Sequence, residues 1–240
     1  MTEPTIKALA KSAEASYTQD KAPTQDYERL HHLSTADVSV YKHKVDPHHI
    51  ISHRGTDIHS NTITKQLKAD LNIAVGNKNA DKLHNNRAKQ TEHIVRQIKE
   101  TNPDHTIHLT GHSLGSSTAQ HAMVKSPYVR DNVKSVDTFN AGSSILGGKG
   151  LSAKSKAYKD IAMKSTHHTI SADAISENAS NNMIGRVKIY ENKQKPSIGQ
   201  HILKMAKPIL QKSALGKIVS FVGDKALSTL SSHSLKNFTK

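Results

Sequence analysis

The sequence predicts an α/β fold, in which a mainly parallel central sheet is flanked by helices and followed by a helical C-terminal segment. Strand-like runs and helix-like runs follow one another along the chain, an order typical of a parallel sheet with helices on its faces. At 240 residues the chain is long enough for one such domain and short for two. We therefore expect one domain over residues 35–240, preceded by an N-terminal helix and tether over residues 1–34.

The first half of this domain contains two strand-like and two helix-like runs. "VSVYKHKV", which begins at Val38, alternates apolar and polar residues, and "HHIISHRGT" follows a turn signal, so the two runs predict a hairpin-like pair. "NTITKQLKADLNIAVG" has apolar residues at a spacing of four, which predicts a helix. "NRAKQTEHIVRQIKETNPD" predicts a second helix with Ile94, Val95 and Ile98 as its buried stripe.

The second half continues the alternation. "HTIHLTG" predicts a strand, and "SSTAQHAMVKS" predicts a helix of small residues that ends before Pro127. Three further strands are predicted from "VKSVDTFNAGSS", "KSTHHTISAD" and "GRVKIYENK". Residues 199–230 are apolar at near-helical spacing, with lysines between and Asp224 as the one acidic residue. This pattern predicts a basic amphipathic segment, which lies on a membrane surface or covers a face of the domain.

The charge balance is strongly basic. Lysine and arginine outnumber aspartate and glutamate by 34 to 20, which favours attraction to polyanions such as nucleic acid or anionic lipid headgroups. The chain has no Arg-rich tract, aromatic stacking motif or known nucleic-acid module, so nucleic acid is the less favoured partner. The 17 histidines are expected to be mostly solvated surface residues that gain positive charge near pH 5.

Several classes of protein are disfavoured by what the composition lacks. There is no cysteine, which excludes disulfides, thiolate zinc sites and a cysteine nucleophile. No signal-peptide pattern and no apolar window of membrane-spanning length occurs, so a cytoplasmic or peripheral membrane location is expected. Adjacent histidines, as in "RLHHL", "PHHI" and "STHHT", point to opposite faces of a strand, so no metal site is predicted from these pairs.

The motif that carries chemistry is "GHSLG", from Gly111 to Gly115, which matches the G-x-S-x-G nucleophile elbow. The elbow places its serine on a strained turn from a strand to a helix, where larger residues at the glycine positions would collide with the backbone. Here the β-prone run "TIHLT" precedes the motif and the helix-prone run "SSTAQHAM" follows it. Ser113 is therefore the candidate nucleophile.

A serine nucleophile needs a histidine base and a carboxylate that orients it, and in this fold both follow the serine in the chain. Asp173 is the best-placed carboxylate, because it comes just after the strand-like run "STHHTIS" at the sheet edge where such sites assemble. His233 is the favoured base, with His201 as the alternative. The eligible carboxylates are Asp131, Asp137, Asp160, Asp173, Glu177, Glu191 and Asp224.

The oxyanion that forms during acyl transfer needs hydrogen-bond donors. One is expected to be the backbone N–H of Leu114, the residue after the nucleophile. The other is expected from Thr56 in "SHRGT", which follows an early strand and can donate from both its N–H and its hydroxyl.

These motifs together resemble the class 3 lipases, a branch of the α/β-hydrolase fold. The resemblance rests on "HRGTD", "KADL", "GHSLGSSTA", "FNAGSS", "TISADAIS" and "HSLKNF", which occur in the family's order between Val38 and Phe238. It implies a hydrolase of acylglycerol or phospholipid esters that needs no cofactor and no metal. Ser113, Asp173 and His233 would be its triad, and Thr56 and Leu114 would form its oxyanion hole.

The chain departs from the family at three points. Ser116 stands where the family often has a second glycine, His53 stands where it often has an aromatic or aliphatic residue, and a bulky aromatic of the following helix is missing. With aromatics at 4% of residues, we expect a shallow or short-chain acyl site. The alternative function is a catalytically weak protein of the same fold that binds a polyanion, either nucleic acid or an anionic membrane.

Overall fold

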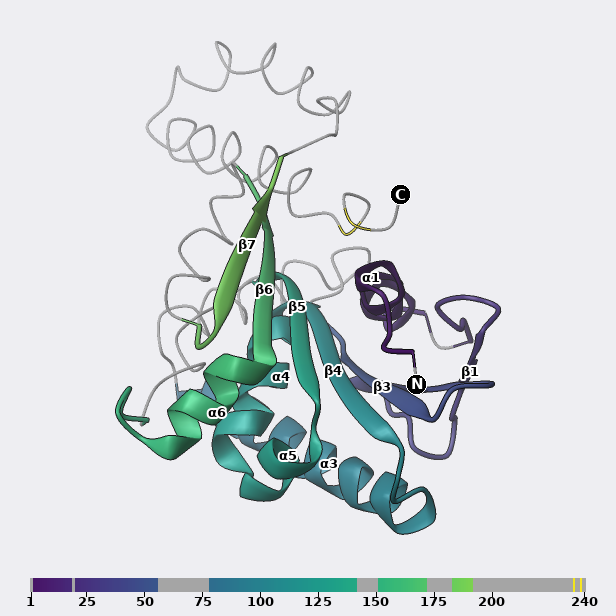
Figure 1. Cartoon of the computed structure of the whole chain (residues 1–240), viewed down its shortest axis with the longest axis horizontal. Coiled ribbons are helices and arrows are strands. Elements are labelled where there is room, and N and C mark those ends of the chain that lie inside the picture. Colours follow the sequence, from purple (N-terminus) through teal and green to yellow (C-terminus); the bar gives the residue numbers. More distant parts are fainter. Residues whose placement is uncertain are drawn as a thin grey trace.

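The architecture was analysed in a computed structural model of the chain (Figure 1). The structure describes residues 2–18, 20–55, 78–141, 151–171, 183–191, 235 and 238, with the backbone alone for residues 78–83. The helices are α1 (Ile6–Ala15), α3 (Lys78–Thr101), α4 (Leu114–Lys125), α5 (Pro127–Asn132) and α6 (Lys156–Lys164). The strands are β1 (Tyr27–Arg29), β2 (Val38–His43), β3 (His48–His53), β4 (Thr106–Ser113), β5 (Ser135–Ala141), β6 (Ser165–Ile170) and β7 (Arg186–Tyr190).

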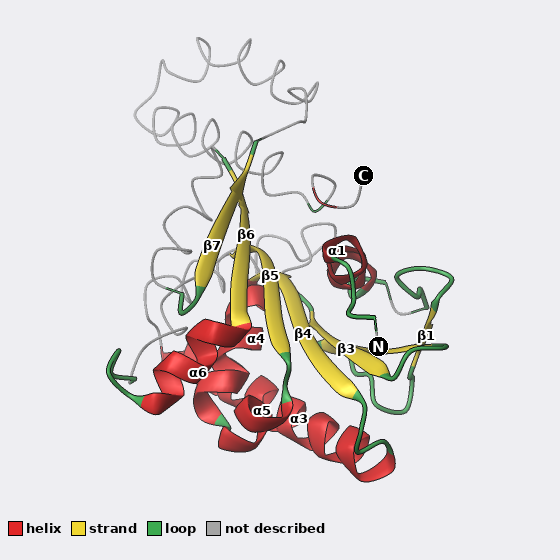
Figure 2. Ribbon diagram, viewed as in Figure 1, coloured by secondary structure: helices red, strands yellow, loops and turns green. Residues whose placement is uncertain are grey.

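The seven described strands form one mixed sheet in which spatial order equals chain order, from β1 to β7 (Figure 2). β1, β2 and β3 are joined as antiparallel neighbours, which confirms the predicted hairpin. β3 to β7 are all parallel. The sheet is thus mainly parallel, as the alternation of elements predicted.

The crossover helices α3, α4, α5 and α6 all lie on one face of the sheet (Figure 2). This arrangement follows from the strand order, since right-handed crossovers that always advance in the same direction place their helices on the same side. The larger core fills the space between these helices and the sheet. Its members include Ile51, Leu109 and Val136 from the strands and Ile98 and Met123 from α3 and α4.

The opposite face is covered by α1 together with two residues far along the chain. Leu9, Ala10 and Ala13 of α1 are buried in a second core, which also contains Leu235 and Phe238. The helix begins at an N-cap, because the Thr5 hydroxyl accepts a hydrogen bond from the N–H of Ala8 at 3.1 Å. Both faces of the central strands are therefore buried, as parallel sheets require.

Most predicted elements are confirmed at their expected places. α3 has Ile94, Val95 and Ile98 buried and ends before Pro103, and each of the four strand-like runs after residue 104 forms a strand. The stretch predicted as a tether contains β1, which pairs with β2 and was not predicted. The helix predicted for "NTITKQLKADLNIAVG" and the segment at 199–230 lie outside the described residues.

The expectation that most histidines are solvated is wrong for the described part of the chain. Buried imidazole rings lie between the strands and helices, and some of them hydrogen-bond neighbouring side chains. For example, His167 Nδ1 is 2.7 Å from the Thr138 hydroxyl, and His108 Nδ1 is 2.9 Å from the Ser135 hydroxyl. The buried histidines are His48, His49, His53, His84, His108, His121, His167 and His168.

Candidate active site

Ser113 lies where β4 ends and α4 begins. Its backbone has φ 55° and ψ −124°, in a region that residues with a side chain rarely adopt. Such a conformation costs on the order of 1–3 kcal/mol and persists only where the surroundings impose it. The side chain is partly exposed, so the hydroxyl is held at the surface on a strained turn, as the elbow motif predicted.

The two glycines of the motif allow the close backbone contacts that build this turn. A Cβ atom at Gly115 would lie 2.1 Å from the His53 carbonyl oxygen, and one at Gly111 would lie 2.4 Å from the Gly115 carbonyl oxygen. Neither separation is possible for a real Cβ atom next to backbone. Both positions therefore require glycine, and the packing of β3 against the start of α4 depends on Gly115.

Leu114 is the first residue of α4, and it is buried. The N–H groups of the first turn of a helix have no partner within the helix, and the helix dipole places partial positive charge there. The N-cap residue, Ser113, makes no capping hydrogen bond with its side chain among the described residues. The backbone N–H of Leu114 thus belongs to the part of the helix that favours a negative charge beside Ser113.

Ser116 stands at the position where the family often has a second glycine. Its side chain is fully buried, and its hydroxyl lies 2.9 Å from the Gly111 carbonyl oxygen and 3.1 Å from the Phe139 carbonyl oxygen. These contacts connect the first turn of α4 to β4 and β5. The serine at this position therefore adds hydrogen bonds that tie the nucleophile turn to the sheet.

The segment after β3 lies directly against the nucleophile. A Cβ atom built at Gly55 would be 3.3 Å from the Cβ of Ser113 and 2.4 Å from the His112 carbonyl oxygen. Arg87 of α3 holds this segment, because its guanidinium donates to the Arg54 carbonyl oxygen at 2.7 Å and to an Asp37 carboxylate oxygen at 2.8 Å. Thr56, the predicted oxyanion donor, is the next residue and lies outside the described residues.

Tyr17 was not predicted to belong to the site. Its hydroxyl is 3.0 Å from Nδ1 of His112, and it would touch a Cβ placed on Gly55. The Arg54 guanidinium lies 5.8 Å from the centre of the Tyr17 ring. Tyr17 follows α1, so the N-terminal helix places a side chain against His112, the residue before the nucleophile. No spacing in the sequence indicates this contact.

His53 fills the position where the family often has an apolar residue. Its side chain is fully buried, and its Nε2 is 3.3 Å from the Thr91 hydroxyl of α3. Burial lowers the pKa of His53 to about 3, so the ring is neutral at physiological pH. A neutral imidazole here packs much as an aromatic ring would.

The other predicted triad members, Asp173 and His233, lie outside the described residues, as do His201, Glu177 and Asp224. Among the described alternatives, Asp131 and Asp160 are on α5 and α6. Asp137 faces His168 instead of the nucleophile, with 3.1 Å between its Oδ1 and the ring Nε2. Asp137 is therefore engaged away from Ser113, and Glu191, the remaining described candidate, directly follows β7.

The carboxyl ends of β5 and β6 are fixed to each other next to the elbow. Asn140 has φ 42°, and its side-chain oxygen accepts the N–H of Ile170, the last residue of β6, at 3.0 Å. Ser171 then donates its N–H to the Tyr190 carbonyl oxygen at 2.7 Å. These bonds hold Ile170 and Ser171, the described residues that precede Asp173 in the chain by three and two positions.

Phe238 brings the far end of the sequence to the same region. Its ring centre is 5.0 Å from that of Phe139, a residue in register with His112 of β4. Leu235 belongs to the same buried cluster. The "HSLKNF" stretch is therefore anchored, at two of its positions, on the sheet beside the nucleophile strand.

Comparison with known proteins gives one family match. The model of the lipase (class 3) family matches residues 39–183, more than half of the chain. Curated protein sequences give no significant match. No helix among the described residues has a stretch long and apolar enough to cross a membrane.

Three solved structures are similar at low identity. The Lip2 lipase of Yarrowia lipolytica is 16% identical with a TM-score of 0.47, and the alignment covers 81% of this chain and 79% of that one. The MDLA protein of Penicillium cyclopium is 14% identical with a TM-score of 0.39, covering 80% and 78%. A further structure described as a fungal lipase is 11% identical with a TM-score of 0.38, covering 80% and 79%.

Proposed function

We propose that Ser113 is the nucleophile of this chain, which belongs to the class 3 lipase family. As a member of this family, the chain is a carboxylic ester hydrolase of the lipase type. The observation that carries the proposal is the backbone of Ser113, with its positive φ between β4 and α4 and with glycines at the two positions of closest approach. Ser113 is partly exposed on this strained turn, so an ester carbonyl can reach its hydroxyl.

The proposed reaction proceeds in two steps. Ser113 Oγ attacks the ester carbonyl carbon while His233 takes the hydroxyl proton, and the resulting tetrahedral oxyanion collapses to the acyl-enzyme as His233 protonates the departing alcohol. Water then attacks the acyl carbon, again giving its proton to His233. The second tetrahedral species expels Ser113, which regains a proton, and releases the fatty acid.

Asp173 is the proposed acid that orients His233 and stabilises its charged form. What supports Asp173 is its position three residues after β6, whose carboxyl end lies two strands from the elbow. What supports His233 is its distance of two residues from Leu235, which packs in the core beside Phe139. His201 remains the alternative base.

The oxyanion would be stabilised by two N–H donors, those of Leu114 and Thr56. Leu114 begins α4, where the helix dipole favours negative charge. Thr56 follows Gly55, which packs against Ser113. Loss of one such donor typically costs on the order of a hundredfold to a thousandfold in rate.

The proposed substrates are acylglycerols or phospholipids approached at an interface. The basic segment 199–230 would dock on an anionic membrane, because its five lysines are opposed only by Asp224. The low aromatic content favours substrates with short or shallowly bound acyl chains.

The nucleophile is tested with Ser113→Ala. We expect the variant to lose hydrolysis of a p-nitrophenyl ester and labelling by a fluorophosphonate probe, because no other hydroxyl occupies the elbow. Circular dichroism should show that the variant is folded. Ser152→Ala, which changes an exposed serine before α6, is the matched control and should keep both activities. Undiminished labelling of Ser113→Ala would exclude Ser113 as the nucleophile.

A further inference from the structure

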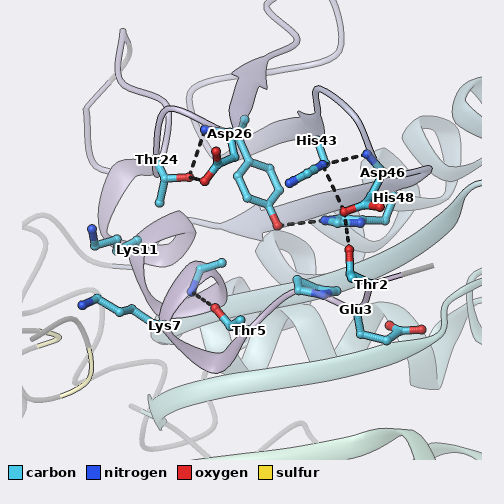
Figure 3. Close-up of a pocket in the computed structure, with 13 residues that line it drawn as sticks. Thr2, Glu3, Thr5, Lys7, Lys11, Thr24, Asp26, His43, Asp46 and His48 are labelled. Carbon is cyan, nitrogen blue, oxygen red and sulfur yellow. Dashed lines mark hydrogen bonds and ion pairs between the residues drawn. The ribbon is translucent and has the colours of Figure 1, made fainter.

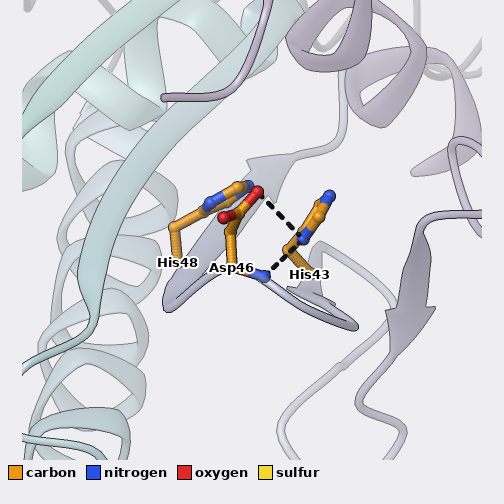
Figure 4. Close-up of side chains that lie close together, drawn as sticks. All are labelled: His43, Asp46 and His48. Atoms are coloured by element: carbon orange, nitrogen blue, oxygen red, sulfur yellow. Dashed lines mark hydrogen bonds and ion pairs between the residues drawn. The ribbon is translucent and has the colours of Figure 1, made fainter. Parts of the chain in front are cut away.

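Two histidines and an aspartate meet at the hairpin between β2 and β3. His43 is the last residue of β2, Asp46 is in the turn, and His48 is the first residue of β3. One ring nitrogen of each histidine and one carboxylate oxygen of Asp46 all lie within 4.8 Å of one another (Figure 4). The members of this cluster are three and two positions apart in the sequence, unlike the adjacent histidine pairs, from which no metal site was predicted.

The three side chains border a cavity of about 260 Å³ that lies between the hairpin and the N-terminal segment (Figure 3). Thr2, Glu3 and Thr5 line its other side. The Thr2 hydroxyl hydrogen-bonds the Asp46 carboxylate. The cavity therefore has room for an ion and one or more water molecules, and its lining combines acidic and hydroxyl groups with Lys7 and Lys11 of α1.

The donor set is one that first-row transition metals prefer. Neutral imidazole nitrogens and a carboxylate oxygen are typical zinc ligands, and three protein ligands leave a fourth position for water. A tetrahedral zinc ion with bonds of about 2.0–2.2 Å needs ligand atoms about 3.5 Å apart. His43 Nδ1 and Asp46 Oδ2 are already 3.6 Å apart.

The remaining adjustment falls on a solvent-exposed turn. His43 Nδ1 accepts the backbone N–H of Asp46 at 2.8 Å, and a metal bond would replace this contact. The N–H released in this way lies in a solvent-facing turn, where Val45 is 88% exposed and water can replace the lost acceptor. Binding thus does not leave a buried donor unpaired.

His48 is held in position from behind. Its side chain is buried, its Nε2 is 2.8 Å from the Tyr27 hydroxyl, and its Nδ1 has no hydrogen-bond partner among the described residues. The Tyr27 hydroxyl therefore fixes the orientation of the His48 ring, as residues behind a metal ligand commonly do.

We propose that His43, Asp46 and His48 bind one divalent transition-metal ion of the zinc type, which fastens the end of β2 to the start of β3 across the hairpin turn. The site is at the opposite end of the strands from the nucleophile, because His48 begins β3 and pairs with Thr106, whereas Ser113 ends β4. The ion is thus a structural ligand, separate from the ester-hydrolysing site.

The test uses Zn²⁺ and Co²⁺ as probes on the full-length chain. Titration calorimetry with Zn²⁺ should give one tight site, and Co²⁺ should give the visible absorption of a tetrahedral nitrogen–oxygen site. His43→Gln and Asp46→Asn should each weaken Zn²⁺ binding by more than about a hundredfold, beyond the 10–100-fold typical of losing a residue that only orients a ligand. Zn²⁺ should also raise the melting temperature of the unsubstituted chain but not of these variants.

The matched control is His93→Gln, which removes an exposed histidine of α3 and should leave the tight site unchanged. Failure to bind Zn²⁺ tightly, equal binding by His43→Gln and Asp46→Asn, or equal weakening in His93→Gln would each overturn the proposal. Circular dichroism without metal establishes that the variants fold. Fluorophosphonate labelling of Ser113 should be the same with and without a chelator, so a failed zinc site and a failed nucleophile are distinguished.

Discussion

At the scale of single residues, the strain at Ser113 has a measurable cost. Glycine adopts positive φ without the Cβ conflict, so Ser113→Gly should relieve the strain that Ser113→Ala retains. We expect Ser113→Gly to be more stable than Ser113→Ala by about 1 kcal/mol in urea unfolding. Neither variant should hydrolyse esters. Equal stabilities would mean that the turn does not strain the serine.

The sequence predicted the nucleophile turn well because its requirements are local. A glycine two residues before and two residues after the serine is needed for contacts that backbone atoms make with each other, so the motif itself records the geometry. The contact of Tyr17 with His112 depends instead on how α1 crosses the sheet, and no local pattern carries that information. Asp173, His233 and Thr56 remain predictions.

At the scale of elements, periodicity predicted long units better than short ones. α3 shows a clear apolar stripe, whereas β1 has three residues, too few to show an alternation. β6, with the sequence "STHHTI", is buried along its whole length because helices or apolar residues cover both faces. The burial of β6 was not predicted because its sequence is mostly polar, and the burial of the histidines was not predicted because histidine is also a polar residue.

The basic segment 199–230 leads to a prediction at the same scale. The chain should sediment with vesicles that contain phosphatidylserine, and much less with phosphatidylcholine alone or at high salt, since each lysine near an anionic surface contributes about 1 kcal/mol. Changing Lys204, Lys207 and Lys212 to glutamine should remove most of this binding.

The control for that experiment keeps the same change in net charge. Lys89, Lys156 and Lys159 are exposed on α3 and α6, and their replacement by glutamine should leave vesicle binding largely intact. If the two triple variants lose binding equally, net charge attracts the membrane and the segment has no special role.

At the scale of the whole molecule, the buried histidines make stability depend on pH. Burial lowers the pKa of His53 and of His84 to about 3 and that of His167 to about 4, against about 6.5 in the unfolded chain. Arg87 and the neighbouring histidines are the smaller causes of the first two shifts. Between these values only the unfolded chain binds the protons, so stability falls as pH falls.

We therefore expect the free energy of unfolding to be highest above about pH 6.5 and to fall steeply towards pH 4. Each of these three histidines should cost on the order of 2 kcal/mol by pH 5, a large part of the 5–15 kcal/mol that domains usually have. Urea titrations across this range measure the loss. A stability that stays level between pH 7 and pH 4.5 would contradict the burial of these rings.

The two faces of the sheet can be covered only in a fixed order during synthesis. One face closes with helices that lie between consecutive strands, so it can form as those strands are made. The other face needs α1 and the residues around Leu235 and Phe238, which share one core. During synthesis α1 therefore waits for a partner that emerges from the ribosome more than 200 residues later, with Phe139 and Ile170 incompletely covered until then. Chaperones that recognise apolar strands would find their target on this face.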